Sequence, residues 1–214
     1  MQDTVVVVAG GGAPAPGWAD AVPAGAPVVA ADGGVETALA AGLAPTVCVG
    51  DFDSAAPALL ERAEALGARI ERHRADKDAT DLELALETAL ALAPRRILVA
   101  GSAGGRLDHL LASLLLLASE RWAAVSIDAI LGPARAHVVR GARALDASPG
   151  ETVTLLALHG PAHGVSTKGL AYTLADETLQ PGSSRGVSNV VTASPIRIEV
   201  RVGVLIALFP GGHT

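Results

Sequence analysis

The sequence predicts a mixed α/β protein, with an N-terminal Rossmann-like parallel sheet that carries helices on both faces and a small all-β sandwich domain after it. Over residues 1–132, short β-branched runs alternate with segments of helical spacing, which is typical of a parallel sheet covered by helices. After Gly132-Pro133 the helical periodicity stops, and apolar runs separated by Gly, Pro and Ser predict strands. We therefore place two domains, at residues 1–132 and 133–214.

The elements follow from these patterns in order along the chain. In the first domain we expect strands at residues 4–9, 27–31, 46–49, 68–73, 95–100 and 124–130, and helices at 35–41, 57–66, 82–92 and 107 to about 121. In the second we expect strands at 136–140, 152–158, 169–174 and 202–208. Residues 195–202 alternate, which puts Ile196, Ile198, Val200 and Val202 on one face.

Composition narrows the class of protein. Half of the 214 residues are hydrophobic but only 2% are aromatic, so the core must consist largely of Val, Leu, Ile and Ala. The net charge of −6 argues against a nucleic-acid-binding surface, which needs clustered Lys and Arg. The single cysteine, Cys48, reads as a small buried hydrophobe and fits a reducing, cytoplasmic location. The apolar run at residues 110–118 is shorter than the roughly 20 residues of a membrane span, so we expect no membrane partner.

An acidic pair follows the third expected strand. In Gly50-Asp51-Phe52-Asp53-Ser54, the side chains of Asp51 and Asp53 lie on one face of an extended chain. Two adjacent carboxylates repel unless a cation lies between them, and Mg²⁺ holding phosphate oxygens is a common solution. The alternative is an Asx-turn followed by a helix cap at Ser54.

Two further segments place charge at the start of a helix. Asp76-Lys77-Asp78-Ala79-Thr80-Asp81 precedes the helix at 82–92, where Thr80 and Glu83 fit a capping box. A glycine-rich turn leads to Arg106 and Asp108 at the start of the next helix, a geometry that can cradle phosphate. Asp108 could instead only complement the helix dipole, and His109 is expected to pack or cap.

These residues share one position in the predicted fold, because each follows the carboxyl end of a strand. Ligands bind at that edge in open α/β sheets. Asp32-Gly33-Gly34 belongs to the same set, and its glycines allow backbone to approach a ligand. Gly10, Gly12, Ala15 and Asp32 also match a dinucleotide-binding fingerprint, but Pro14, Pro16 and Pro23 leave little room for the helix that it requires.

The chain resembles the thiamine pyrophosphokinase (thiamine diphosphokinase) family. The resemblance rests on five segments in order: Ala31-Asp32-Gly33-Gly34, Gly50-Asp51-Phe52-Asp53-Ser54, Lys77-Asp78-Ala79-Thr80-Asp81, Gly104-Gly105-Arg106-Leu107-Asp108-His109, and Lys168-Gly169-Leu170 with Ser188-Asn189. It implies an α/β catalytic domain, a β-sandwich, and a homodimer whose thiamine pocket lies between the catalytic domain of one subunit and the β domain of the other.

The resemblance also implies a reaction and a set of residues. The reaction is transfer of the pyrophosphoryl group of ATP to the hydroxyethyl oxygen of thiamine, with release of AMP. Asp51, Asp53 and Asp81 match Mg²⁺-binding acids, and a carboxylate such as Asp81 or Asp108 would accept the hydroxyl proton. The positions that match the nucleotide, phosphate or thiamine sites are Asp32, Gly33, Gly34, Ser54, Lys77, Thr80, Arg106, Asp108, Tyr172, Ser188 and Asn189.

Three other functions stay open at this point. A related pyrophosphokinase could act on a pterin alcohol. Asp51-x-Asp53 could be the D-x-D of a metal-dependent nucleotide-sugar transferase, although this leaves the segments at 77–81 and 104–109 unexplained. A nucleotide-binding regulator without catalysis is the non-enzyme alternative, and the intact set of acids argues against it.

Overall fold

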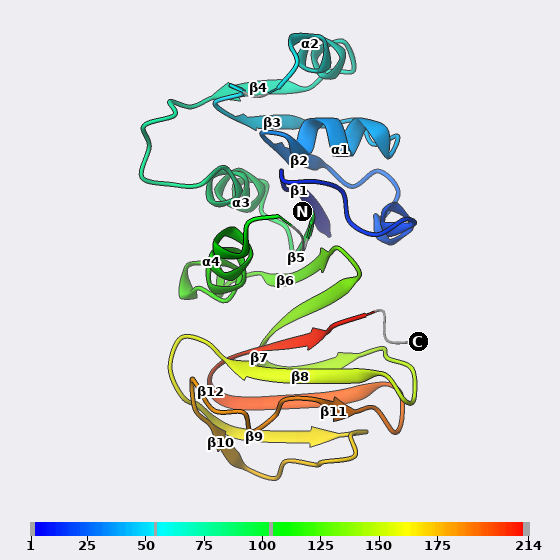
Figure 1. Ribbon diagram of the computed structural model, residues 1–214, viewed down its shortest axis with the longest axis vertical. Coiled ribbons are helices and arrows are strands. Elements are labelled where there is room, and N and C mark those ends of the chain that lie inside the picture. The colour runs from blue at the N-terminus through cyan, green and yellow to red at the C-terminus, as the bar shows by residue number, and fades with distance from the viewer. Residues whose placement is uncertain (1–2, 54, 103–104, 212–214) are drawn as a thin grey trace. The chain divides into compact units, whose positions relative to one another are not determined.

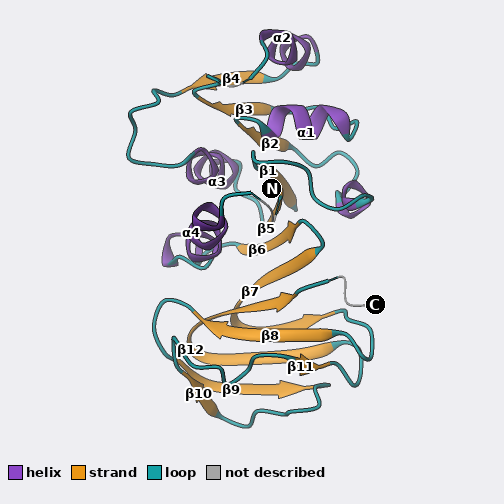
Figure 2. Ribbon diagram, in the orientation of Figure 1, coloured by secondary structure: helices purple, strands orange, loops and turns teal. Residues whose placement is uncertain are grey.

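The computed structural model describes residues 3–53, 55–102 and 105–211, and its fold is mixed α/β. Along the chain the elements are β1 (Thr4–Val8), η1 (Trp18–Ala21), β2 (Val28–Ala31), α1 (Gly34–Ala40), β3 (Val47–Gly50), α2 (Pro57–Ala65), β4 (Arg69–Arg72), α3 (Asp81–Ala91), β5 (Arg96–Gly101), α4 (Leu107–Leu117), η2 (Glu120–Trp122), β6 (Ser126–Leu131), β7 (Ala134–Leu145), β8 (Thr152–Ala157), β9 (Ala162–Lys168), β10 (Glu177–Leu179), β11 (Asn189–Val190) and β12 (Ile196–Phe209). Figure 1 labels these elements, and Figure 2 separates helices from strands by colour.

The chain forms two compact units, and neither is continuous in sequence. The first comprises Met1–Ser113 and Val125–Pro133, and the second comprises Leu114–Ala124 and Ala134–Thr214. Each is described here by itself. Among the residues that the structure describes, no helix is both long and apolar enough to span a membrane.

The first unit is built on a parallel sheet with strand order β6-β5-β1-β2-β3-β4. Every residue of β1, β2 and β3 is buried, as expected for strands covered on both faces. Val6, Val8 and Val28 pack with Trp18 of η1 and Ala38 of α1. The intervening side chains point to the other face, where α3 lies against β1, β2 and β3 (Figure 1). The parallel sheet with helices on both faces therefore agrees with the sequence pattern.

The segment after β1 tests whether the chain contains the dinucleotide-binding fingerprint. Gly10, Gly11 and Gly12 lead into a loop and then into η1, which has four residues. No α-helix begins there in the fully described stretch of residues 9–33. The pyrophosphate-binding helix that the fingerprint needs is therefore missing from this position.

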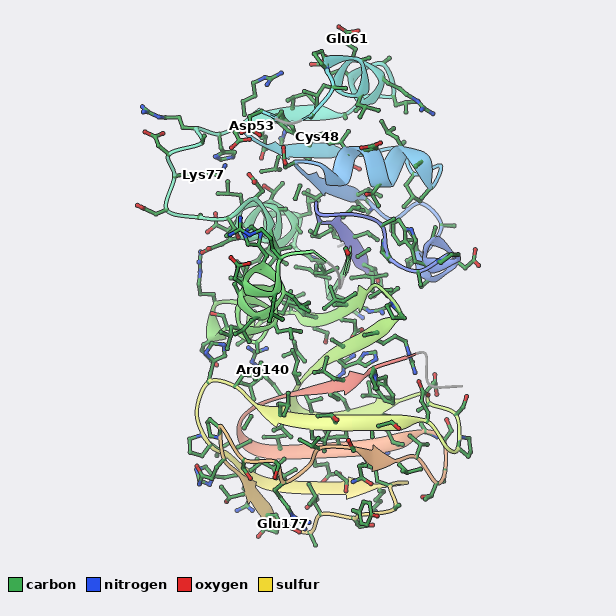
Figure 3. The ribbon with its side chains drawn as sticks, in the orientation of Figure 1. Cys48, Asp53, Glu61, Lys77, Arg140 and Glu177 are labelled. Atoms are coloured by element: carbon green, nitrogen blue, oxygen red, sulfur yellow. The ribbon has the colours of Figure 1, made fainter. Side chains whose placement is uncertain are left out.

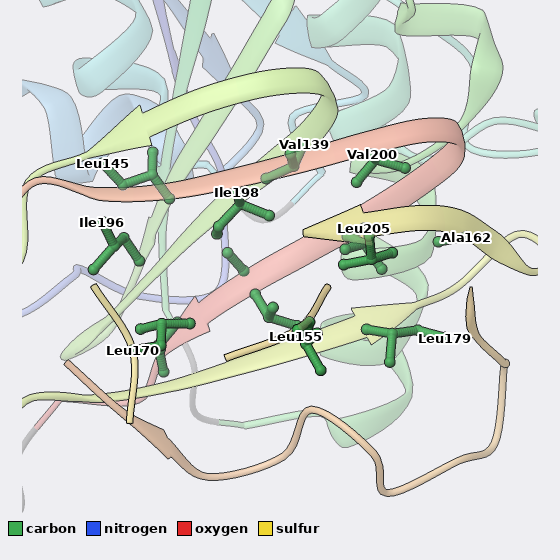
Figure 4. Close-up of a cluster of buried hydrophobic side chains, with 14 of the residues drawn as sticks. Val139, Leu145, Leu155, Ala162, Leu170, Leu179, Ile196, Ile198, Val200 and Leu205 are labelled. Carbon is green, nitrogen blue, oxygen red and sulfur yellow. The ribbon is translucent and has the colours of Figure 1, made fainter. Parts of the chain in front are cut away.

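The second unit is an antiparallel β structure organised around β12. This strand pairs with β7 on one side and with β8 and β9 on the other. Most of its buried residues join one apolar cluster, in which Leu155, Leu170 and Leu179 come from β8, a loop and β10 (Figure 4). In Figure 2, the chain from β7 onward is strand and loop.

Three details of this unit differ from the sequence prediction. The expected strand at residues 169–174 is wrong: it is a loop that makes one isolated bridge, Leu170 with Val191. Strands β9, β10 and β11 were not predicted. Ile196, Ile198 and Val200 are buried as expected, but Val202 is 60% exposed, because the register of β12 shifts between Val200 and Leu205.

Helix α4 is shorter than predicted. It was expected to continue to about residue 121, but it ends at Leu117. The indole N–H of Trp122 donates to the carbonyl of Leu116 at 2.8 Å, and Nη2 of Arg140 donates to the carbonyls of Ala118 and Ser119, each at 2.7 Å. The carbonyls just after the helix are thus satisfied by Arg140, which is distant in sequence, so no local pattern reveals this contact.

Candidate active site

Three carboxylates meet at the carboxyl edge of the parallel sheet in the first unit. Asp32 directly follows β2, and Asp51 and Asp53 follow the neighbouring strand β3. One oxygen from each lies within 4.8 Å of the others. Figure 3 labels Asp53 beyond the end of β3. The acidic pair predicted from the sequence therefore lies together with Asp32, which we had assigned to the nucleotide rather than to the metal.

The backbone that carries these carboxylates has an uncommon conformation at two residues. Asp32 and Phe52 have φ values of 44° and 56°, in the left-handed region that most residues avoid. The backbone N–H of Asp32 donates to the carbonyl of Val49 at 2.8 Å, which fixes it beside β3. The N–H of Asp53 donates to Oδ1 of Asp51 at 3.2 Å. Strained residues of this kind are frequent at functional sites, where the surrounding structure maintains them.

The glycines after Asp32 allow close packing at the start of α1. A Cβ at Gly34 would lie only 2.1 Å from the carbonyl oxygen of Val8 in β1. A Cβ at Gly33 would come no closer than 3.9 Å to a neighbouring heavy atom. Gly34 is therefore required by packing against β1, whereas Gly33 leaves the backbone beside Asp32 open.

Lys77 places a positive charge beside the acidic pair. Its Nζ lies 2.9 Å from Oδ1 of Asp81 and 3.6 Å from Oδ2 of Asp51, and its side chain is only 16% exposed. Partial burial lowers the pKa of Lys77, but the hydrogen bond to Asp81 and the attraction of Asp81 and Asp51 outweigh this effect and raise it. Lys77 is therefore a firm positive charge between two of the predicted metal ligands.

Asp51 stays ionised for related reasons. The hydrogen bond from the N–H of Asp53 lowers the pKa of Asp51 most, partial burial opposes this, and the nearby Lys77 lowers it further. Among the residues that the structure describes, the cluster of Asp32, Asp51 and Asp53 includes neither Asp81 nor Asp108. The structure thus brings two of the three predicted metal ligands together with Asp32, and it pairs the third with Lys77.

Thr80 caps helix α3 as the sequence predicted. Its Oγ1 accepts a hydrogen bond from the N–H of Glu83 at 3.2 Å. Because this bond occupies the hydroxyl as an acceptor, the O–H of Thr80 is still able to donate. A capping role and a contact with a phosphate oxygen are therefore compatible at this residue.

Arg106 and Asp108 bind each other at the start of α4. Nε and Nη2 of Arg106 lie 3.2 Å and 2.6 Å from the two carboxylate oxygens of Asp108. This pairing, first through the hydrogen bond and also through the charge of Arg106, lowers the pKa of Asp108. Both side chains are largely exposed. Ser54 and Gly104, which the sequence had also indicated, lie outside the described residues.

The donor set at Asp32, Asp51 and Asp53 fits a hard divalent cation such as Mg²⁺. All three supply carboxylate oxygen, the ligand that Mg²⁺ prefers, from one compact position. Cys48 in β3 is not part of this site, because it is buried and burial raises the pKa of its thiol to about 11.

The second unit carries a separate cleft with a volume of about 350 Å³. Tyr172 and Asn189 line it, as do Leu174, Ser183, Ser184, Arg185, Gly186 and Val187. Ser188 adjoins it with φ of 57°, and its N–H donates to Oγ1 of Thr154 at 3.0 Å. The three predicted residues Tyr172, Ser188 and Asn189 thus gather at one place, although Ser188 lines a neighbouring hollow with Thr152 and Thr154.

Sequence reasoning missed three polar residues that line this cleft, Ser183, Ser184 and Arg185. Nε and Nη2 of Arg185 bind both carboxylate oxygens of Glu177 at 3.0 Å and 2.9 Å. Ser183 and Ser184 precede Arg185 in the same turn. The Pro181-Gly182 turn and the opposite charges eight residues apart were the available signals, and neither is specific for a ligand site.

Two family models match the chain, one for each region of sites. A model described as the thiamin pyrophosphokinase catalytic domain matches residues 23–128. A second, described as the thiamin pyrophosphokinase vitamin B1 binding domain, matches residues 137–205. The first range contains the acidic site, and the second contains the cleft at Tyr172 and Asn189.

Individual proteins agree with these matches. The thiamine pyrophosphokinase of Bacillus subtilis (strain 168) is 40% identical over 89 residues, which cover 42% of this chain and 42% of that protein. Thiamine pyrophosphokinase 1 of Oryza sativa subsp. japonica is 28% identical over 166 residues, which cover 72% of this chain and 62% of that protein. The aligned segments thus span less than two thirds of either relative.

A solved structure extends the similarity to the whole fold. The crystal structure of thiamine pyrophosphokinase from Bacillus subtilis superimposes with a TM-score of 0.86 at 25% identity, covering 99% of this chain and 100% of that one. Together with the two family models, this similarity establishes that the chain belongs to the thiamin pyrophosphokinase family.

Proposed function

We propose that this protein is a thiamine diphosphokinase, which transfers the pyrophosphoryl group of ATP to thiamine in an Mg²⁺-dependent reaction and releases AMP. The observation that carries the proposal is the convergence of Asp32, Asp51 and Asp53 in a chain that matches both the catalytic and the thiamine-binding models. In the reaction, the hydroxyethyl oxygen of thiamine bonds to the β-phosphorus of ATP. The bond from that phosphorus to the oxygen it shares with the α-phosphorus breaks, and the hydroxyl proton passes to a base.

The residues at the sheet edge divide into cation ligands and phosphate ligands. Asp51 and Asp53, with Asp32 beside them and Asp81 as the further predicted ligand, would hold Mg²⁺. When bound, Mg²⁺ would neutralise phosphate charge and orient the polyphosphate for in-line displacement. Lys77 and Arg106 supply the positive charge for phosphate oxygens, and each is already held in place by a carboxylate.

The proton of the thiamine hydroxyl goes to a carboxylate, and we assign this role to Asp81 or Asp108. Both belong to segments of the first unit that the sequence had singled out. The pairing with Arg106 lowers the pKa of Asp108, which weakens it as a base. The acidic surroundings also suit the positive thiazolium ring of thiamine.

Thiamine would be held by the second unit, in which Tyr172 offers an aromatic face and Ser188 and Asn189 form the adjoining turn. The Rossmann-like catalytic domain, the β-sandwich domain, their boundary near residue 132, the homodimer with thiamine between subunits and a cytoplasmic location are parts of this proposal. Their support is the resemblance to the family and the sequence pattern.

The test is to incubate the purified protein with ATP, Mg²⁺ and thiamine and to measure AMP and thiamine diphosphate together. Equal amounts of both products are expected. ADP with thiamine monophosphate would mean that the donor geometry is misread, and bound ATP without turnover would favour another acceptor, such as a pterin alcohol, or a regulator.

Asp53→Asn tests the cation site within the same assay. It should reduce turnover by roughly 10²–10³-fold, because one charged group that supports the transition state is lost. It should change the free energy of unfolding by about 0.5 kcal/mol or less, since Asp53 is exposed. The matched control is Glu61→Gln in α2, which also removes one exposed carboxylate and should leave turnover unchanged (Figure 3).

A further inference from the structure

Asn189 is nearly fully buried beside the cleft of the second unit, and its side chain is occupied within the chain. It is 3% exposed. Its Oδ1 accepts hydrogen bonds from the N–H of Tyr172 at 3.0 Å and from the N–H of Val190 at 2.9 Å, and its Nδ2 donates to the carbonyl of Tyr172 at 2.8 Å. An asparagine side chain has two acceptor sites and two donors, so three of its four positions are used.

These hydrogen bonds join both backbone polar groups of Tyr172, its N–H and its carbonyl, to Asn189 of β11. A neighbouring backbone bond, from the N–H of Ala171 to the carbonyl of Val190 at 2.8 Å, runs alongside them. The Tyr172 side chain itself is 66% exposed and lines the cleft. These contacts therefore fix the backbone from which the ring extends, while burial does not hold the ring itself.

The far end of the same loop is held independently. The N–H of Leu174 donates to Oγ1 of Thr167 at 2.9 Å, and the N–H of Thr167 donates to the carbonyl of Leu174 at 3.0 Å. Thr167 and Leu174 are both buried. Between this end and the Ala171 bond, Asn189 is the side chain that binds both backbone polar groups of Tyr172.

We propose that Asn189 is a positioning residue: it grips the peptide groups of Tyr172 and so holds the tyrosine ring as one wall of the cleft, instead of binding the ligand itself. The ligand class that suits this cleft is a flat aromatic cation, because Tyr172 offers a π face to such a ring. This part of the proposal rests on the proposed function, under which the ligand is thiamine.

The lone tyrosine of the chain makes the proposal measurable without any ligand. Protein labelled with 3-fluorotyrosine will give one ¹⁹F resonance, from position 172. Asn189→Ala should shift or broaden this resonance in the ligand-free protein, because the backbone of Tyr172 loses its hydrogen bonds to the Asn189 side chain. Ser166→Ala is the matched control: it removes one exposed hydrogen bond, which Oγ of Ser166 accepts from the N–H of Asp176, and should leave the resonance unchanged.

Kinetics with thiamine and ATP form the second measurement. Asn189→Ala should raise the KM for thiamine by about tenfold while the KM for ATP stays the same, as expected when one buried hydrogen-bond set is lost. Tyr172→Ala should raise the KM for thiamine similarly, and since the ring is exposed this variant should fold normally. In the double variant the two effects should not add, because both remove the same aromatic wall.

The outcomes separate this proposal from the proposed function. An unchanged ¹⁹F resonance in ligand-free Asn189→Ala, with the KM for thiamine raised, would make Asn189 a direct ligand and overturn the proposal. Fully additive effects in the double variant would also overturn it. If Asn189→Ala fails to fold, Asn189→Asp, which keeps the acceptor oxygen but sets a second oxygen against the Tyr172 carbonyl, should also shift or broaden the ligand-free resonance. Wild-type protein without thiamine turnover would refute the proposed function, while the ligand-free resonance would still decide the positioning role.

Discussion

At the scale of single residues, the candidate site pairs each predicted phosphate-binding cation with a carboxylate. Lys77 lies between Asp81 and Asp51, and Arg106 lies against Asp108. The spacing of Arg106 and Asp108, two residues apart, recurs at Arg74 and Asp76, where the guanidinium also binds both carboxylate oxygens. Phosphate would therefore meet cations that are already ordered, and the pKa values of Asp51 and Asp108 are lowered.

Removing the cation beside Asp108 should change its titration. In Arg106→Gln we expect the lowered pKa of Asp108 to rise towards its ordinary value of 3.8, because the hydrogen bond and the charge of Arg106 are lost. Ionised Asp108 contributes stability that is fully present above its unfolded pKa and is lost as the pH falls through the folded value. The variant should lose this contribution, so its unfolding free energy will fall less steeply on acidification in that range.

The measurement is a ¹³C carboxyl NMR titration of Asp108 with a parallel series of acid unfolding curves. Arg74→Gln is the matched control, since it breaks a similarly exposed pair of the same spacing. It should raise the pKa of Asp76 and leave that of Asp108 unchanged. An unchanged Asp108 titration in Arg106→Gln would contradict the pairing seen in the structure.

At the scale of the elements, the site depends on how closely β1, β2 and β3 approach the start of α1. Gly34 packs against the carbonyl of Val8, and Gly50 lies where a Cβ would come 3.2 Å from the backbone of Asp32. The sequence had assigned Gly33 and Gly34 together to ligand approach. The structure distinguishes them, because only Gly34 is confined by a strand.

Substituting these two glycines should separate packing from ligand approach. Gly34→Ala is expected to lower the free energy of unfolding by roughly 1–3 kcal/mol, because its Cβ would overlap the Val8 carbonyl. Gly33→Ala has space and a φ of −58°, so its effect should stay within about 0.5 kcal/mol. Urea denaturation of both variants will check this, and equal losses would show that the close approach does not govern stability.

The cap of α3 can be tested in the same way. Thr80→Ala removes the acceptor of the Glu83 N–H and should cost about 1 kcal/mol of stability, whereas Thr80→Ser keeps it. If Thr80 also binds phosphate, the alanine variant will raise the KM for ATP and the serine variant will not. A loss of stability with an unchanged KM would limit Thr80 to capping.

At the scale of the whole molecule, the chain passes from the first unit to the second, back to the first and again to the second. Residues 114–124 belong to the second unit although β6, which follows them, belongs to the first. Within the second unit, Arg140 of β7 donates to the carbonyls of Ala118 and Ser119, and the Nε2 atom of His159 lies 2.7 Å from the carbonyl of Leu115. Side chains of the β structure thus satisfy the end of a helix that precedes it.

Arg140 donates to two of these carbonyls, and its loss should be costly. Burial lowers the pKa of Arg140, and Glu120 opposes this, so the guanidinium lies in poorly hydrated surroundings. Arg140→Ala should reduce the free energy of unfolding by roughly 1–3 kcal/mol, because two carbonyls lose their donor. Arg62→Ala, on the exposed surface of α2, is the control, and the midpoints of urea unfolding provide the measurement. Equal midpoints would mean that water replaces Arg140 without loss.

Taken by itself, the sequence determined which segments form the parallel sheet and which chemical groups follow its strands. Runs such as Val5–Val8 and the pair Asp51 and Asp53 carry local signals, because periodicity and spacing act between residues close in the chain. The Thr80 cap was predictable for the same reason.

Only the tertiary structure decided which of these groups meet. Asp32 joins Asp51 and Asp53 because β2 and β3 are neighbours in the sheet, and Lys77 reaches back to Asp51 from a later loop. The loop at residues 169–174 departs from its strand-like pattern because Thr167 and Asn189 hold its backbone. These interactions join residues far apart in sequence, so their free energy depends on the folded arrangement, and no local pattern of residues encodes it.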